Sequence, residues 1–318
     1  MTSNRPIAVV AFGGNAILDA GDDGSFETQL EKAKSACREI LKLMHRGYEI
    51  VLVHGNGPQV GNLLIQFEKA RDIIPVPPLD VAVASSQGLL GHMLEISMRT
   101  VLAEDCMERN VATLLTQIIV DREDPAFANP TKPIGPFFTK EEAERLMAEK
   151  KWRMVEDSGR GWRRVVCSPK PCRILELQSI RQLLECGTVV ITCGGGGIPV
   201  NYTTSSVMGT DGVIDKDSTA ALLAYNIGAE LFMIVTGVNK VSIDFGKPTQ
   251  REIDVMTVSE ARKWLEEGQF PPGSMGPKIR SCIEYVEKGG TEAIITRQDN
   301  IGRAVNHPGC CTRIVRDN

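Results

Sequence analysis

Residues 7–15 read IAVVAFGGN, and this stretch decides the predicted fold. An unbroken apolar run that ends in a glycine pair is typical of a strand buried on both faces of a sheet. Similar runs recur at residues 50–53, 111–120, 189–192, 231–235 and 293–296. Amphipathic helical patterns, for example at 28–46 and 277–288, lie between them. The alternation predicts an α/β protein with a mostly parallel sheet.

Glycine-rich loops follow three of these predicted strands. They read GGN at 13–15, HGNGP at 54–58 and GGGG at 194–197. Glycine lets backbone amides approach a phosphate closely, and ligands of parallel sheets bind beyond the carboxyl ends of the strands. One such loop could be a plain turn, but three at comparable strand ends predict a phosphate site. The spacing fits neither the dinucleotide fingerprint nor the P-loop, because Gly61 comes one residue too late after Gly55 and Gly57.

Two lysines stand where helices are predicted to begin. Lys216 lies in VIDKDSTAA at 213–221, and Lys278 ends GSMGPK at 273–278. A helix N-terminus carries partial positive charge, so a lysine there is unfavourable unless an anion binds the helix amides. Either lysine alone could simply extend into water. Together with the glycine loops, the pair predicts that both lysines reach one polyphosphate.

Length, charge and cysteine content narrow the class of protein. The chain has 318 residues, enough for about two domains, and a net charge of −4. It has no basic stripe for nucleic acid and no polybasic helix for a membrane surface, so a small acidic ligand is the expected partner. The nine scattered cysteines indicate unpaired thiols in a reducing compartment. Because no signal peptide or membrane-spanning run is apparent, we expect a cytoplasmic protein.

The segment 121–172 interrupts the alternation of strands and helices. It is rich in proline and charge, with a helical pattern at 140–150 and a hairpin signal formed by 152–155 and 162–166. We interpret this segment as a lid inserted between strands. Lys132 lies within PTKPIGP at 130–136, where prolines stiffen the backbone and could hold the amine towards the cleft. A solvated lysine on a stiff loop is the alternative.

Five motifs together give a family resemblance: FGGNA at 12–16, HGNGPQVG at 54–61, PTKPIGP at 130–136, VIDKD at 213–217 and GSMGPK at 273–278. They resemble the carbamate kinases of the amino-acid kinase superfamily over essentially the whole chain. Other members of that superfamily usually carry a lysine in the first-strand loop, whereas this chain presents Lys216 directly before Asp217. The inserted lid is a second mark of the carbamate kinase branch.

The resemblance implies a three-layer αβα sandwich with a protruding lid. It implies an N-terminal acceptor lobe at 1–201, with the lid at about 121–172, and a C-terminal nucleotide-binding lobe at 202–318. The implied reaction is reversible phosphoryl transfer between carbamoyl phosphate and ADP, giving ATP and carbamate, often for ATP synthesis from arginine breakdown. Magnesium held mainly through the nucleotide phosphates and a homodimer are also implied, with no metal-binding side chain of the protein.

The resemblance also assigns roles to individual residues. Lys216 and Lys278 would flank the migrating phosphoryl group, with Asp217 between them, while Lys132 would descend with the lid onto carbamate or carbamoyl phosphate. No catalytic base is needed, because carbamate is already an anionic nucleophile. Amides for the phosphoryl oxygens would come from Gly13, Gly14, Asn15, Gly55, Asn56 and Gly57. The nucleotide would lie near Thr236, Gly237, Val238, Val241, Met275 and Lys278.

Some positions depart from the family pattern. Asn239 stands where an acidic residue is common, and Ser242 stands where an aromatic residue often lies near the adenine. His54 is interpreted as a packed core residue, with catalysis as the alternative. An acetylglutamate or glutamate kinase would share the fold but should carry a lysine in the first-strand loop, which this chain lacks. A non-catalytic nucleotide sensor would have no reason to retain both lysines with Asp217.

Overall fold

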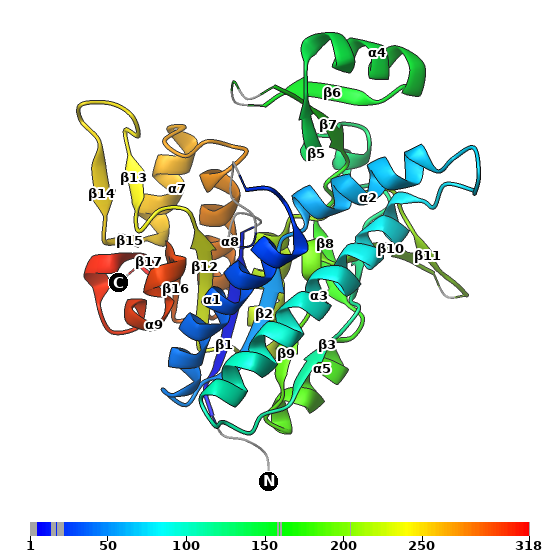
Figure 1. The fold of residues 1–318 in the computed structure, drawn as a ribbon. Helices are drawn as coiled ribbons and strands as arrows, with labels where there is room; N and C mark the ends of the chain where they lie inside the picture. Colours follow the sequence, from blue (N-terminus) through cyan, green and yellow to red (C-terminus); the bar gives the residue numbers. More distant parts are fainter. Residues whose placement is uncertain are drawn as a thin grey trace.

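The computed structural model describes residues 5–13, 17, 22–157, 159, 161–203 and 205–317. An eight-stranded sheet with the order β15-β17-β16-β12-β1-β2-β9-β3 forms its centre (Figure 1). From β16 to β3 all neighbouring strands are parallel, whereas β17 runs antiparallel to β16. The predicted mostly parallel sheet is therefore confirmed. In sheet order, the strands are Val255–Thr257, Cys311–Val315, Glu292–Arg297, Leu231–Thr236, Ile7–Phe12, Glu49–His54, Val189–Ile191 and Val111–Thr113.

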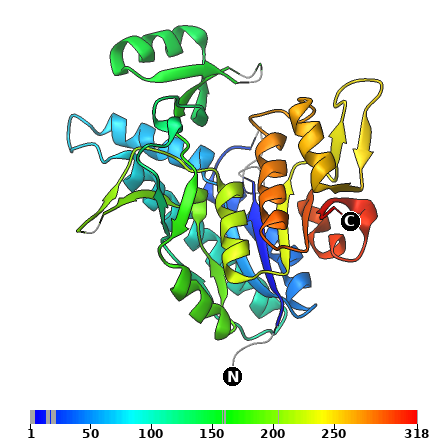
Figure 2. The same ribbon diagram turned by 180° about the vertical axis from the view of Figure 1, so that it is seen from behind.

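Helices cover both faces of this sheet, and strand side chains alternate between two cores. Val9 and Ala11 of β1 lie in one core, and Ala8 and Val10 lie in the other. The first core includes helices α5 (Leu177–Glu185), α6 (Lys216–Ile227), α7 (Val258–Glu266) and α8 (Met275–Glu287). The second includes α1 (Phe26–Met44), α3 (Leu79–Glu104) and α9 (Ile301–Ala304). Figure 1 looks onto α1 and α3, and Figure 2 looks onto α6 and α8, so the α/β sandwich is confirmed.

The run 111–120 was predicted as one strand, and this prediction is wrong. β3 ends at Thr113, and β4 (Gln117–Val120) belongs to a second sheet with the order β11-β10-β4-β8. The chain turns at Thr116, whose hydroxyl lies 2.9 Å from the Leu114 carbonyl and 2.7 Å from the Thr192 hydroxyl. Both strands are apolar, so hydrophobicity does not reveal the turn between them. The other members of the second sheet are Val207–Gly209, Ile198–Tyr202 and Pro171–Ile174.

The inserted segment forms a small sheet, β5-β7-β6, that protrudes from the large one (Figure 1). Its strands are β5 (Lys132–Phe138), β7 (Trp162–Val166) and β6 (Arg153–Glu156), and α4 (Lys140–Lys150) covers it. The predicted hairpin and the predicted helix at 140–150 are confirmed. The division of the chain into two lobes at residue 201 stays a prediction.

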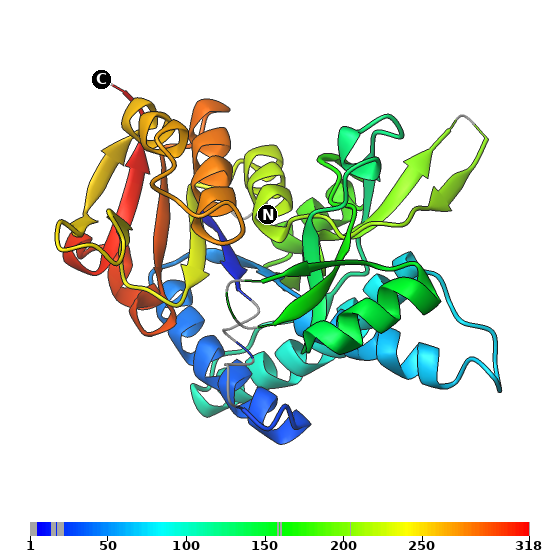
Figure 3. The same cartoon turned by 90° about the horizontal axis from the view of Figure 1, so that it is seen from above.

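The lid meets the rest of the molecule at α2 (Gly57–Lys69), over which α4 and the small sheet lie in Figure 3. Gly61 of α2 faces Gly135 of β5 so closely that a Cβ atom on Gly61 would lie 1.9 Å from the Gly135 Cα. Gly135 also has a φ of +75°, which disfavours any side chain there. Two glycines therefore set how deeply β5 sits on α2.

The remaining strands, β13 (Val241–Ile243) and β14 (Arg251–Ile253), form an antiparallel hairpin. The helices predicted at 28–46 and 277–288 are α1 and α8, which begin at residues 26 and 275. Lys216 is the first residue of α6, and Lys278 lies in the first turn of α8. Among the described helices, none combines the length and the apolar character needed to cross a bilayer.

Candidate active site

A cavity of about 830 Å³ opens at the carboxyl ends of the central strands. Its wall is built from the loops after β1, β2, β9 and β12, the first turns of α6 and α8, and the lid strand β5. This is the edge of the sheet at which the sequence predicted a phosphate site. The predicted site residues that line the cavity are Gly13, Gly55, Asn56, Gly57, Lys132, Lys216, Asp217, Thr236, Gly237 and Lys278.

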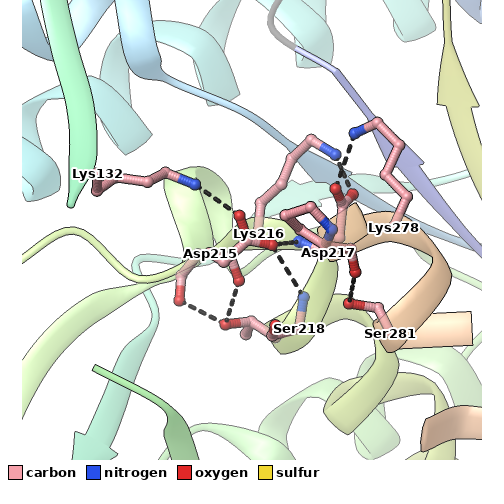
Figure 4. Close-up of polar contacts among 10 residues, drawn as sticks. Lys132, Asp215, Lys216, Asp217, Ser218, Lys278 and Ser281 are labelled. Atoms are coloured by element: carbon pink, nitrogen blue, oxygen red, sulfur yellow. Dashed lines mark hydrogen bonds and ion pairs between the residues drawn. The ribbon is translucent and has the colours of Figure 1, made fainter. Parts of the chain in front are cut away.

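The first turns of α6 and α8 bring two lysines onto one carboxylate (Figure 4). Oδ1 of Asp217 pairs with Nζ of Lys216, and Oδ2 accepts a hydrogen bond of 2.9 Å from Nζ of Lys278. All three side chains are largely buried, with exposed fractions of 4% for Asp217, 10% for Lys216 and 15% for Lys278. The sequence placed Asp217 between the two lysines, and the structure shows this arrangement.

The cluster shifts the pKa of each of its members. Burial alone would raise the pKa of Asp217, but Lys216 and then Lys278 outweigh burial and hold it below its usual range. Burial lowers the pKa of Lys216, and the neighbouring Lys278 lowers it further. Together these two effects outweigh the attraction of Asp217, which would raise it. Burial also disfavours the charged form of Lys278, yet the neighbouring Asp217 raises its pKa overall. Asp217 therefore stays ionised between two cations.

Asp215, which the sequence analysis did not select, stands directly before this cluster. It is the N-cap of α6, and its Oδ1 accepts from the amides of Asp217 at 3.0 Å and Ser218 at 3.3 Å. Its Oδ2 accepts a 2.6 Å hydrogen bond from Nζ of Lys132, which reaches across from the lid. Burial raises the pKa of Asp215, but the Lys132 ammonium outweighs it and lowers the pKa. Lys132 thus points into the cleft and not into solvent (Figure 4).

The glycine loops line the cavity in a different way from that expected. The amides of Gly13 and Gly55 already donate to the Val235 and Phe12 carbonyls, at 3.2 Å and 3.0 Å. These two amides are therefore engaged within the sheet, contrary to the role predicted for them. Gly57 begins α2 without a side-chain cap and lines the cavity, and because Pro58 has no N–H and the Val60 amide donates to the Asn56 carbonyl at 2.8 Å, the Gly57 amide is the candidate donor at this helix start. Gly14 and Asn15 lie outside the described residues.

The residues predicted to bind the nucleotide fall into two groups. Thr236 and Gly237, at the end of β12, line the cavity with Lys278. Val241 is buried, Met275 packs against a core, and Val238 is exposed outside the cavity wall.

Several lining residues had no local signal that singled them out. Lys32 and Ser35 reach the cavity from α1, Arg163 from β7, and Arg297 from the end of β16. Arg163 is fixed by a 3.0 Å hydrogen bond from Nε to the Gly135 carbonyl and by a 3.1 Å ion pair with Asp157. Arg297 is the exception, because this last residue of the buried strand β16 lies at the same edge of the sheet as the glycine loops.

His54 is a packed residue, as the sequence analysis interpreted it. It is 1% exposed, and burial lowers its pKa to about 4. Its ring lies against Gly194, where a Cβ atom would come within 2.3 Å of Nε2. Among the described residues there is no group of three or more His, Cys, Asp or Glu side chains that could hold a metal ion.

Comparison with known proteins places the chain in a family. The model of the amino acid kinase family matches residues 6–297. The carbamate kinase of Pyrococcus furiosus is 44% identical over 299 residues, covering 93% of this chain and 95% of that protein. That of Thermococcus kodakarensis is 43% identical over 312 residues, covering 97% of this chain and 99% of that protein.

Solved structures agree with these matches. Carbamate kinase from Giardia lamblia bound to AMP-PNP has a TM-score of 0.91 at 40% identity, covering 99% of this chain and 100% of that chain. The fold, the cavity and the family match define a phosphotransferase of the amino acid kinase family. Within that family, the chain belongs to the carbamate kinases.

Proposed function

We propose that this enzyme transfers a phosphoryl group reversibly between carbamoyl phosphate and ADP, giving ATP and carbamate. The observation that carries the proposal is the buried Lys216–Asp217–Lys278 cluster at the cavity floor. Phosphoryl transfer requires positioning and neutralisation of charge, with little covalent chemistry from the protein. Two cations held on one carboxylate supply both, because they are fixed before the substrate arrives.

Within this reaction, Lys216 and Lys278 would stabilise the charge on the migrating phosphoryl group. Asp217 would orient both ammonium groups and remain ionised, since the two lysines lower its pKa. It is a poor general base for the same reason, and carbamate has no proton to lose at the attacking oxygen. Amides at the start of α2, near Asn56 and Gly57, would add hydrogen bonds to the phosphoryl oxygens.

The lid would serve the smaller substrate. Lys132 bonds to Asp215 at 2.6 Å in this structure, and an arriving carbamoyl group or carbamate would offer it a second anion. The nucleotide would lie on the C-terminal side, along Thr236, Gly237 and Lys278 and near Val238 and Met275, whereas the fully buried Val241 would not touch it. The Giardia lamblia enzyme bound to AMP-PNP supports a nucleotide site in this fold.

Magnesium fits this site through the nucleotide. Asp215 and Asp217, the carboxylates at the centre, are each engaged by lysine, which leaves the phosphate oxygens and water as the ligands for the ion. When bound, magnesium would neutralise phosphate charge. In the cell, we place the enzyme in the cytoplasm, where it would make ATP from carbamoyl phosphate during arginine breakdown.

A homodimer is part of the proposal. Large apolar side chains are exposed on neighbouring elements, namely Val81 and Leu89 of α3, and Tyr202, Val207 and Met208 of the β10–β11 hairpin. A second copy of the chain would cover such a surface. Light scattering after size exclusion should give twice the chain mass of 34.7 kDa, and a monomer at micromolar concentration would contradict the dimer.

The decisive experiment is a coupled assay of the purified protein. ATP formed from ADP and carbamoyl phosphate is consumed by hexokinase, and the resulting glucose 6-phosphate is oxidised with NADP. We expect ATP formation that depends on both substrates and on magnesium. Acetylglutamate and glutamate are offered with ATP in parallel. Turnover of one of these acids, with none of carbamoyl phosphate, would refute the proposal.

A further inference from the structure

The side chain of Asn56 has a fixed orientation in the cavity wall. Asn56 is 3% exposed, precedes the first turn of α2, and donates a 2.8 Å hydrogen bond from Nδ2 to the hydroxyl of Ser86 on α3. Ser86 is fully buried, and its hydroxyl donates to the Val83 carbonyl at 2.6 Å. A hydroxyl has one proton, so Ser86 can only accept from Asn56. The amide is therefore held with Nδ2 towards α3 and Oδ1 on its opposite edge.

A glycine loop fixes the plane of the same amide. A Cβ atom on Gly195 would lie 2.1 Å from Nδ2 and 2.6 Å from Oδ1 of Asn56, so the flat face of the amide rests on this glycine. Gly195 has a φ of +65°, which also favours glycine. Gln87 of α3 holds the loop by donating from Nε2 to the Gly194 carbonyl at 3.1 Å. The contacts with Ser86 and Gly195 therefore restrict both the rotation and the tilting of the Asn56 amide group.

The orientation matters because the other polar groups at the cavity floor suit anions. Lys132, Lys216 and Lys278 attract phosphate and carboxylate oxygens, but an ammonium group repels an N–H donor. The carboxylates of Asp215 and Asp217 are engaged by these lysines. Within the part of the chain that the structure describes, Asn56 Oδ1 makes no hydrogen bond, which leaves it as an acceptor for a substrate.

We propose that Asn56 Oδ1 recognises the amino group of the carbamoyl moiety, and that Ser86 is the positioning residue that fixes this acceptor. This role rests on the proposed reaction, and it would explain why the enzyme selects a carbamoyl group over an acetyl group. Carbamoyl phosphate and acetyl phosphate have nearly the same shape, but the first presents an amino group where the second has a methyl group. An oriented amide oxygen accepts a hydrogen bond from the amino group, whereas a methyl group has no such hydrogen to donate.

Two serines on α3 provide a matched test. Ser86 and Ser97 are both fully buried, and each donates to a carbonyl of its own helix, Ser97 to Met93 at 2.7 Å. They differ in that Ser86 also accepts from Asn56. Ser86→Ala should raise the KM for carbamoyl phosphate about tenfold, the effect of losing one well-oriented hydrogen bond. The KM for ADP and the inhibition constant of acetyl phosphate should stay within about twofold, and Ser97→Ala should change none of the three.

Asn56→Leu, which keeps the shape of the side chain and removes the acceptor, should abolish the preference for carbamoyl over acetyl phosphate. This second variant decides the question if Ser86→Ala does not fold. Equal weakening of both acyl phosphates in either variant, or kinetics of Ser86→Ala that match those of Ser97→Ala, would overturn the proposal. An inactive parent enzyme would instead refute the proposed reaction, so the two failures are distinguishable.

Discussion

Replacing Lys216 with alanine tests the charge balance of the site. The described cluster contains two lysines and one aspartate, a net charge of +1, and Lys216→Ala reduces it to zero. The carboxylate of Asp217 would keep its 2.9 Å hydrogen bond from Lys278, so no buried charge is left without a partner. We therefore expect the variant to fold.

The size of the effect follows from this geometry. One unit charge about 4 Å from the transferred phosphoryl group, at an effective dielectric constant of about 20, contributes about 4 kcal/mol. Removing one preorganised donor of this kind typically lowers kcat by roughly 100- to 1000-fold. Because the lysine is rigidly held before the substrate binds, the loss should fall mainly on kcat, with a smaller change in KM.

The assay is steady-state ATP formation from ADP and carbamoyl phosphate, with thermal unfolding of each variant as the check on folding. Arg109→Met is the matched control: its side chain is 16% exposed and pairs with the buried Glu49 at 3.2 Å, at the opposite end of β2. It should lower the unfolding temperature and leave turnover per folded molecule unchanged. A folded Lys216→Ala enzyme with turnover near that of the parent would refute the reasoning.

Three further predictions use other parts of the site. Asp217→Asn should lower kcat without changing the shape of the pH–rate profile, because the pKa of this carboxyl already lies below the assay range; an ionisation that vanished in the variant would mean that Asp217 is a base. Lys132→Ala should reduce kcat/KM for carbamoyl phosphate about thirtyfold and leave the KM for ADP unchanged, and equal damage to both would argue against a lid contact. Gly61→Ala should push β5 off α2 and lower stability by about 1–3 kcal/mol in chemical denaturation, and parental stability would contradict the close approach to Gly135.

Much of the fold could be predicted because buried parallel strands leave a strong local signal. Residues 8–12 of β1 are all buried, so an unbroken apolar run marks the strand. α4 was also predicted with the bounds that the structure shows, and these bounds are fixed locally: Thr139 and Glu142 form a capping box at its start, and Lys151 ends it in the left-handed conformation. The error at 111–120 arose where two strands of different sheets are joined by a turn at Thr116 that carries no glycine or proline signal.

The site was predictable only in part, because some of its contacts join distant segments. The lysines of α6 and α8 stood out since they occupy the unfavourable end of a helix. Asp215 was readable as an N-cap, but its bond to Lys132 joins residues 83 positions apart. Ser86 and Gln87 lie on the buried face of α3, where their residue types give no sign of the loops that they hold. Such roles depend on tertiary packing.

The two lysines of the cluster are not equivalent, and the difference indicates how the site responds to substrate. Both are buried, yet the pKa of Lys216 is lowered and that of Lys278 is raised. Burial and the second cation, Lys278, lower the pKa of Lys216 more than Asp217 and Asp215 raise it, whereas the same two carboxylates outweigh burial at Lys278. A bound polyphosphate brings negative charge to both, so it should raise the pKa of Lys216 and secure its proton. The anion that the cluster serves should therefore stabilise most the charge of Lys216, the lysine whose burial is less well compensated.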